Sequence, residues 1–311
     1  MNTLPLVFYK TSLLWVDDDE LLLQAASDQY GRSYNIKIFD NPNVCLDFFQ
    51  QYQSLLSKQF FLRGYKELDD YDSINHMPID FNIQALAHLH TNPNRHNEIS
   101  VMVVDYQMPN LNGLTLCERI NSFPIKKILL TGEVDDNEAV KGFNEGIINR
   151  FLRKDDLMLP EKLDLYFKAL TKQYFCEQTA ALLSYLEVDR KLPLTDPVFI
   201  HFFDKWCSTH NICEYYLIDK NGSFLTINER KEIKYFIVHT DASLDFFTSM
   251  NDDEDGVVYF TDAVKKREKI PFFGINKEPW RFKPQEWSPF FYSPQIIVGR
   301  EKYYWSIVYP L

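Results

Sequence analysis

The sequence predicts an α/β domain built on a parallel sheet, followed by a helical segment and a carboxy-terminal α+β domain. From residue 11 to about residue 172, short apolar segments alternate with segments of helical periodicity. The apolar segments contain few polar residues, as expected for parallel strands that are covered by helices on both faces. Beyond residue 193 the pattern changes to β-rich runs that follow one another closely along the chain.

The first predicted strand covers residues 11–17 (TSLLWVD) and ends in the acidic run DDDE. The next residues, LLLQAASDQY, have the spacing of an amphipathic helix. A second strand is predicted over 35–40 (NIKIFD), and Asn41-Pro42 marks the start of a second helix. Strand and helix therefore alternate from the beginning of the domain.

Mixed polar and aromatic sequence over 57–97 interrupts this alternation and is interpreted as an insertion. The third strand follows at 99–105 (ISVMVVD) and is apolar apart from Ser100 and its final residue. Two further strands, at 126–132 (KKILLTG) and 148–154 (INRFLRK), each lead into a predicted helix. The sequence thus predicts five strands, with the insertion placed before the third.

Apolar residues recur near a 3.6-residue period from 160 to 186, which predicts one long amphipathic helix or two short ones. Their stripe includes Leu163, Phe167, Leu170 and Tyr174. Such a stripe packs on its own sheet or forms the seam of a coiled-coil dimer. Both alternatives are compatible with the sequence, and a homodimer is one expected form of the protein.

The carboxy-terminal segment contains a hairpin pattern over 214–228 (EYYLIDKNGSFLTIN), in which Asn221-Gly222 separates two β-rich runs. Further strands are predicted at 231–240 and 302–310. No Walker loop, helix-turn-helix pattern or basic stripe occurs in 195–311. The sequence therefore indicates no nucleic-acid-binding or catalytic motif in this segment.

The composition is that of a folded protein, with 45% hydrophobic and 25% charged residues. The formal net charge of -11 disfavours binding to nucleic acid and to anionic membrane surfaces. No apolar run reaches the length that spans a bilayer, and the start MNTLPLVFYK lacks a signal-peptide pattern, so a cytoplasmic protein without membrane insertion is expected.

The five cysteines are odd in number and scattered, which favours reduced thiols over a disulfide framework. One group, Cys207, His210 and Cys213, suggests a zinc site by its spacing. It supplies three ligands and no fourth of matching spacing, so zinc binding is disfavoured there.

Polar residues gather where the predicted strands end. Asp17 and Asp18 close the first strand, Asp105 the third, Thr131 the fourth and Lys154 the fifth. The carboxyl ends of parallel strands lie at one edge of the sheet, so we expect these side chains to meet. Three crowded carboxylates raise one another's pKa and call for a cation, and Mg²⁺ prefers such hard oxygen ligands. The lysine amine and the threonine hydroxyl can each contact an oxygen of a phosphoryl group.

The segments VDDDE (16–20), VVDYQMPNLNG (103–113), LLTG (129–132) and FLRK (151–154) together resemble the receiver domain of two-component response regulators. The resemblance covers about residues 11–172 apart from the insertion. It implies the flavodoxin-like doubly wound fold, with strand order 2-1-3-4-5.

The resemblance also implies roles for the residues that match its motifs. Asp105 is the nucleophile that takes a phosphoryl group from a phosphohistidine. Asp18 is a direct Mg²⁺ ligand, Asp17 is a ligand through water, and the backbone carbonyl of Gln107 completes the protein's share of the metal shell.

Two switch residues follow from the same resemblance. Thr131 moves toward the phosphoryl group, and Phe151 occupies the aromatic position that turns inward in response. The sequence departs from the family after Lys154, where Asp155 replaces the usual proline. This replacement puts the geometry of that loop, and hence the lifetime of the phosphorylated state, in question.

The predicted domains are a receiver at 1–158 with the insertion 57–97, a helical linker at 159–192, and an output or sensory domain at 193–311. The hairpin with its Asp-x-Asn-Gly turn resembles part of a PAS-type sensory domain. The protein is then a response regulator that a histidine kinase or phosphotransfer protein phosphorylates and that relays the signal through an interaction or ligand-binding domain. The alternative is a phosphorylation-regulated effector enzyme whose catalytic residues the sequence does not reveal.

Overall fold

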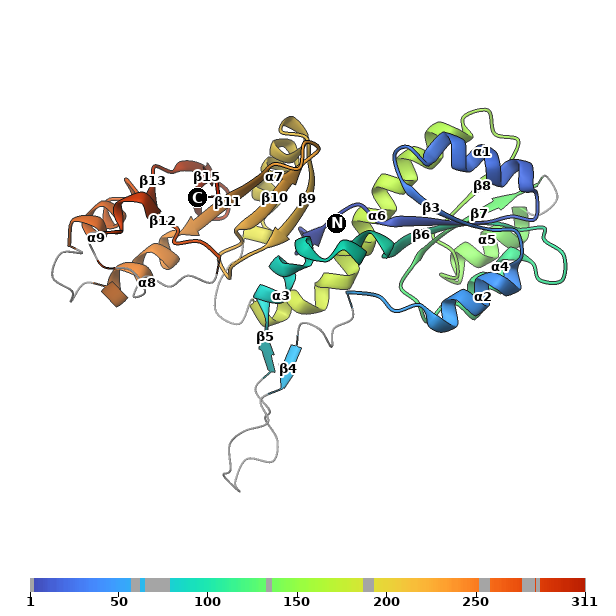
Figure 1. Ribbon diagram of the computed structural model, residues 1–311, viewed down its shortest axis with the longest axis horizontal. Coiled ribbons are helices and arrows are strands. Elements are labelled where there is room, and N and C mark those ends of the chain that lie inside the picture. Colours follow the sequence, from blue (N-terminus) through green and yellow to red (C-terminus); the bar gives the residue numbers. More distant parts are fainter. Residues whose placement is uncertain are drawn as a thin grey trace, which may run out of the picture. The chain divides into compact units, whose positions relative to one another are not determined.

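The protein consists of two compact units (Figure 1). The amino-terminal unit contains residues 9–57 and 92–178, and the carboxy-terminal unit contains residues 1–8, 58–91 and 179–311. The sequence predicted domain boundaries at 158 and 192. The structure instead assigns the first eight residues and most of the insertion to the carboxy-terminal unit. The computed structural model describes residues 3–56, 62–64, 79–132, 136–186, 193–251, 258–275, 283 and 286–310.

The amino-terminal unit contains a five-stranded parallel sheet in the order β3-β2-β6-β7-β8. Counted along this sheet in chain order, the arrangement is 2-1-3-4-5, so the predicted flavodoxin-like fold is confirmed. Val16 pairs with Phe39 on one side and with Val104 on the other, which aligns the strand ends. The strands are β2 (Ser12–Val16), β3 (Asn35–Phe39), β6 (Ile99–Asp105), β7 (Lys126–Thr131) and β8 (Arg150–Arg153).

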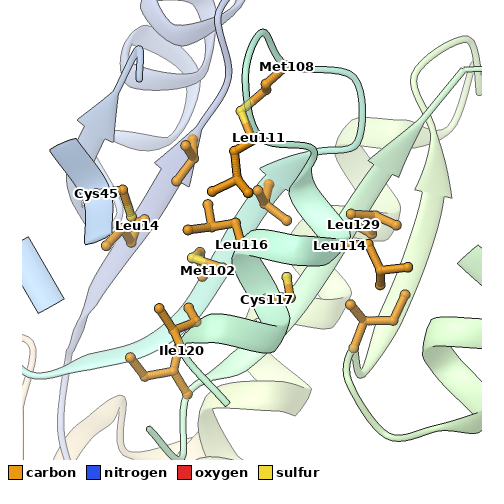
Figure 2. Close-up of a cluster of buried hydrophobic side chains, with 14 of the residues drawn as sticks. Leu14, Cys45, Met102, Met108, Leu111, Leu114, Leu116, Cys117, Ile120 and Leu129 are labelled. Atoms are coloured by element: carbon orange, nitrogen blue, oxygen red, sulfur yellow. The ribbon is translucent and has the colours of Figure 1, made fainter. Parts of the chain in front are cut away.

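Helices cover both faces of this sheet, which explains the apolar runs within its central strands (Figure 1). One face packs against α1 and α6 and contains Trp15, Val103 and Leu130. The other face packs against α2, α4 and α5 and contains Leu14, Met102 and Leu129 (Figure 2). The helices are α1 (Glu20–Tyr30), α2 (Pro42–Gln51), α4 (Gly113–Arg119), α5 (Asp136–Asn144) and α6 (Leu159–Leu186).

Local capping fixes where the first two helices begin. The side chain of Asp19 accepts hydrogen bonds from the backbone N–H groups of Leu21 and Leu22, and Asn41 caps the second helix by accepting from Asn43. Pro42 then occupies the first turn, where its missing N–H is not needed. In the acidic run after the first strand, Asp19 therefore caps α1, and Asp17 and Asp18 remain available for the site.

Residues 159–186 form one continuous helix, α6, which resolves the choice between one helix and two. Leu163, Phe167 and Leu170 are almost completely buried, and they belong to the same apolar cluster as the strands of the amino-terminal sheet. The predicted apolar stripe thus packs on its own sheet. Of the two alternatives, packing on its own sheet is the one found. Because these three residues are buried there, they are not free to form a coiled-coil seam.

The carboxy-terminal unit contains a six-stranded sheet in the order β1-β9-β10-β11-β15-β14, with antiparallel pairing throughout. The predicted hairpin is confirmed: Asp219 accepts two backbone hydrogen bonds inside the turn, and Gly222 has a φ of 97°, which favours glycine. The strands are β1 (Val7–Phe8), β9 (Ile212–Leu217), β10 (Phe224–Asn228), β11 (Ile233–Thr240), β14 (Gln295–Val298) and β15 (Lys302–Val308).

The carboxy-terminal unit also contains helices and two short strand pairs. Asp196 caps α7 and also accepts hydrogen bonds from the Arg300 N–H and the Tyr303 hydroxyl, so one buried carboxylate holds a helix start against the β14–β15 turn. The elements are α3 (Ile83–His88), α7 (Pro197–Thr209), α8 (Asp241–Asn251), α9 (Val258–Lys265), and two short strand pairs, β4 (Leu62–Gly64) with β5 (Ile79–Phe81) and β12 (Ile270–Pro271) with β13 (Phe291–Tyr292).

Within the described part of the chain, none of the helices combines the length and the apolar character that crossing a membrane requires.

Candidate functional site

The candidate site lies at the carboxyl ends of four parallel strands of the amino-terminal unit. Asp17 follows β2, Asp105 is the last residue of β6, Thr131 is the last residue of β7, and Lys154 follows β8. These strands are neighbours in the sheet and run in the same direction. The structure therefore brings together the residues that the sequence predicts for this edge.

Three carboxylates form the acidic part of the site. One oxygen from each of Asp17, Asp18 and Asp105 lies within 4.8 Å of the others. Asp17 is fully buried and Asp105 is 4% exposed, whereas Asp18 faces solvent. The backbone N–H of Asp19 donates to Asp17 Oδ1 at 3.0 Å, which fixes the direction of the innermost carboxylate.

Lys154 lies between two of these carboxylates. Its Nζ is 2.9 Å from Asp17 Oδ2 and 3.0 Å from Asp105 Oδ1. Its backbone N–H donates to the carbonyl oxygen of Thr131, so the pairing of β8 with β7 continues up to the lysine and aims its side chain across the sheet edge. One cation thus faces three carboxylates, and the site keeps an excess of negative charge.

The charges shift the pKa values of two residues. Burial raises the pKa of the Asp105 carboxyl, and the nearby charge of Asp17 raises it further, against the opposing effects of Lys154 and of the Gln107 backbone N–H. Burial alone would lower the pKa of Lys154, but the contacts with Asp17 and Asp105 outweigh it and the pKa is raised. The lysine therefore stays charged, while the buried carboxylate gains from any added cation.

The Thr131 hydroxyl is a buried polar group whose hydrogen bonds are not made within the described residues. Its residue is 0% exposed, and its Oγ1 has no hydrogen-bond partner there. A buried hydroxyl without a partner costs free energy, about 1–3 kcal/mol, so it calls for an explanation. A ligand oxygen bound at this strand end would provide the acceptor.

The loop after Asp105 depends on a glycine. A Cβ at Gly113 would lie 2.0 Å from the carbonyl oxygen of Asp105, closer than any real contact. The Gly113 N–H also donates to the carbonyl of Tyr106, which closes the loop over residues 106–113. The backbone at the end of β6 is therefore in direct contact with the first residue of α4, and only glycine fits there.

We predict that Gly113→Ala destabilises the protein by about 1–3 kcal/mol, because the methyl group must displace backbone rather than a mobile side chain. Gly132→Ala is the matched control, since a Cβ there meets nothing within 4 Å. Urea unfolding of the two variants measures the difference. Equal midpoints for both variants would contradict the close contact.

The loop after Lys154 is where the sequence departs from the receiver pattern. The Arg153 guanidinium donates from Nε and Nη2 to the two carboxylate oxygens of Asp155, at 3.0 and 2.9 Å. Asp156 accepts from the Met158 N–H at 2.9 Å and pairs with Lys162. Local ion pairs and a turn cap therefore hold this loop in the absence of the usual proline. The sequence interpretation overlooked the Arg153–Asp155 pair, which the charge pattern RKDD could have suggested.

The two remaining predicted site residues lie around this centre. Gln107 is exposed, and its backbone N–H donates to the Asp105 carboxylate. Phe151 is half-buried on β8, and its ring packs against Phe143 of α5 with 6.4 Å between ring centroids. The proposed metal-binding carbonyl and the proposed switch motion of these residues stay predictions.

The cysteine and histidine group does not form a comparable centre. Among the described residues, Asp17, Asp18 and Asp105 meet the spacing of a metal-binding group, whereas Cys207, His210 and Cys213 do not. The His210 ring instead bonds through Nδ1 to the carbonyl of Trp206 and stacks on its indole ring. In this part of the chain, zinc binding through these residues has no structural support.

The strand order and the residues at the strand ends define the amino-terminal unit as a receiver fold of the kind found in response regulators. Over 99% of its length, the chain matches the structure of the Legionella pneumophila response regulator LqsR, with a TM-score of 0.77, 28% sequence identity and 89% of that chain covered. The similarity to LqsR thus extends beyond the receiver to the carboxy-terminal unit.

Other solved structures match a smaller part of the chain. An adenylate cyclase from Rhodopirellula baltica has 18% identity and a TM-score of 0.40, and covers 57% of this chain and 98% of that chain. The signal receiver domain of an HD domain-containing protein from Pseudomonas fluorescens Pf-5 has 18% identity and a TM-score of 0.35, and covers 53% of this chain and 97% of that chain. No family model and no curated protein matches the sequence.

Proposed function

We propose that this protein is a two-component response regulator that accepts a phosphoryl group on Asp105 from a histidine kinase or a phosphotransfer protein. The observation that carries the proposal is the grouping of Asp17, Asp18 and Asp105 within 4.8 Å, with Lys154 bridging two of them at the ends of parallel strands. A structural salt bridge needs one carboxylate, so three carboxylates around one lysine favour a phosphoryl-transfer site.

In the proposed reaction, a carboxylate oxygen of Asp105 attacks the phosphorus of an N-phosphohistidine. The P–N bond breaks, the imidazole leaves, and an acyl phosphate forms on the aspartate. Lys154 is held within 3.0 Å of both buried carboxylates and is placed to contact a phosphoryl oxygen. The buried Thr131 hydroxyl supplies a hydrogen-bond donor to another oxygen of the same group.

The carboxylates fit a divalent cation, and we assign Mg²⁺ to them. All three offer hard oxygen ligands, and the raised pKa of Asp105 indicates that this side chain favours added positive charge. Asp18, Asp105 and the Gln107 carbonyl would bind the ion directly and Asp17 through water. When bound, Mg²⁺ neutralises charge on the phosphoryl oxygens and on the carboxylates around them.

Thr131 and Phe151 are the proposed switch residues. Phosphorylation adds about -1.5 to -2 charge at Asp105, which attracts the Thr131 hydroxyl from β7. Phe151 lies on the neighbouring strand, opposite Leu129, and is only half-buried, so space vacated by the threonine can be filled by its ring. A change at this strand pair would alter the surface formed with α5.

For the carboxy-terminal unit we propose a non-DNA-binding role in which it binds a partner or a small ligand. The net charge of -11 opposes binding to phosphate backbones. A cavity of about 200 Å³ in this unit is lined by residues that include Tyr235, Phe273 and Tyr292, which offers a place for a small ligand. The PAS-like resemblance of the hairpin stays a prediction.

Phosphorylation by a small phosphodonor tests the proposal. We expect purified protein with acetyl phosphate and Mg²⁺ to gain one phosphoryl group per chain, detected by mass spectrometry and removed by hydroxylamine, which cleaves acyl phosphates. Chelation of the metal is expected to reduce the labelling at least about tenfold, because charge on the attacking oxygen is then poorly neutralised. The proposed chemistry would be contradicted if hydroxylamine did not remove the phosphoryl group, or if the chelator left the extent of labelling unchanged.

A further inference from the structure

Glu98 is a buried carboxylate at the opposite end of the strand that carries Asp105. It directly precedes β6, whose last residue is Asp105, and it is the first residue after the predicted insertion. It is 2% exposed. In the described part of the chain no lysine, arginine or histidine lies within ion-pair distance of it, which is unusual because buried charges are ordinarily paired.

Three hydroxyl groups and one backbone N–H converge on this carboxylate. Oε1 accepts hydrogen bonds from the hydroxyls of Ser54 at 2.6 Å, Tyr52 at 3.2 Å and Tyr174. Oε2 accepts from the Leu55 N–H at 2.8 Å. The Tyr52 hydroxyl is also bonded by the backbone N–H of Ile99, so the network includes the first residue of β6.

These donors come from segments that are far apart in the sequence. Ser54 and Leu55 lie just before the insertion, Glu98 lies just after it, and Tyr174 lies on α6. One side chain therefore fastens both ends of the insertion to each other and to the helix that leads toward the carboxy-terminal unit. The hydrogen bonds depend on an acceptor at position 98.

The environment favours the neutral form of this acceptor. Burial raises the pKa of Glu98, and its hydrogen bonds compensate for this only in part. A carboxyl whose pKa is raised in the folded state stabilises the fold below its unfolded value of about 4.3, and this contribution is lost as the pH rises through the folded pKa. Because burial outweighs the hydrogen bonds, the folded state around this network is more stable when Glu98 carries a proton.

We propose that Glu98 is a proton-controlled latch: its protonated form holds the stem of the insertion against α6, and its ionisation loosens both. The carboxylate is bonded by three segments of the chain, and no cation among the described residues pairs with it, so its protonation state changes the stability of these contacts. The latch is independent of the phosphorylation chemistry, since it lies at the other end of β6.

The other titratable groups near Glu98 do not carry this effect. Tyr52 and Tyr174 face it directly, and burial raises the pKa of both hydroxyls, so they stay neutral at physiological pH. Lys37 lines the same cleft, of about 380 Å³, without pairing with Glu98 in the described structure. Glu98 is thus the carboxyl of this network, and burial raises its pKa.

Hydrogen exchange tests the latch. Between pH of about 5.5 and about 8.5, we expect the protection factors of amides at 52–56 and 171–176 to fall at least about tenfold in the wild-type protein, as loss of one proton-linked contact predicts. Glu98→Gln, which keeps a neutral acceptor, should show less than about a threefold change over the same range. Glu161→Gln, at an exposed position on the same helix, should behave as wild type.

A titration of the wild-type protein supports the test without any variant. We expect the side-chain carboxyl carbon of Glu98 to titrate, by NMR, with a midpoint above the ordinary glutamate value of about 4.3. A midpoint at or below this value would overturn the proposal. So would the same loss of protection with pH in the wild type and in Glu98→Gln.

Discussion

Replacing Asp105 with asparagine is expected to reduce phosphoryl labelling by at least about a hundredfold, to the background of the assay, because the amide oxygen is a poor nucleophile compared with a carboxylate. Asparagine keeps the shape of the side chain, so the loop closed by Gly113 should remain intact. Intact-mass measurement after incubation with acetyl phosphate and Mg²⁺ gives the labelled fraction directly.

The control for this experiment is Asp28→Asn on α1, which removes an exposed carboxylate that bonds only to Gln24 in the described structure. It should label as the wild type does. Full labelling of Asp105→Asn, with the phosphoryl group mapped to another residue, would show that the reactive carboxylate lies elsewhere. A loss of labelling in Asp28→Asn would point instead to a general effect of lost negative charge.

The second large effect concerns Mg²⁺. A ligand that binds only the folded state stabilises it by about 1.4 kcal/mol at a tenfold excess over its Kd, which raises the melting temperature. We expect Asp18→Ala to abolish this rise, because the variant removes the solvent-facing carboxylate from the group of three. Melting curves with and without millimolar Mg²⁺ measure the shift.

Asp19→Asn is the matched control for this variant. Asp19 is the adjacent acidic residue, but its side chain caps α1 by accepting from Leu21 and Leu22, and asparagine retains that role. The control should therefore keep the full response to Mg²⁺. If Asp18→Ala and the wild type shift equally, the ion binds outside the group formed by Asp17, Asp18 and Asp105.

The sequence by itself predicted the five strands of the amino-terminal sheet and the polar residues at their ends, and its resemblance to receiver domains predicted their order. The five strands, their order and the positions of Asp17, Asp105, Thr131 and Lys154 at strand ends agree with the structure. The reason is that parallel strands buried on both faces are marked by continuous apolar runs, and each run ends where a polar residue reaches solvent. These signals are local in the sequence.

Tertiary structure decided the features that depend on partners distant in the sequence. Nothing in VFYK or in SPQIIVG indicates that β1 and β14 complete the same sheet, because two- and four-residue strands have too little periodicity to be recognised. Tertiary structure also decided between the two alternatives for α6, which were packing on its own sheet and forming a coiled-coil seam. Leu163 and Phe167 have the same spacing in a coiled coil and in a helix on a sheet, and only the contacts with Trp15 and Val103 distinguish the two.

Glu98 is a single side chain whose burial the sequence does not indicate. In the sequence it is one more glutamate before a strand, a position that ordinarily faces solvent. Its burial becomes visible only when Ser54, Leu55 and Tyr174 converge on it from other segments. A buried carboxyl needs hydrogen-bond partners, and those of Glu98 lie more than 40 residues away along the chain, at separations of 43, 44 and 76 residues.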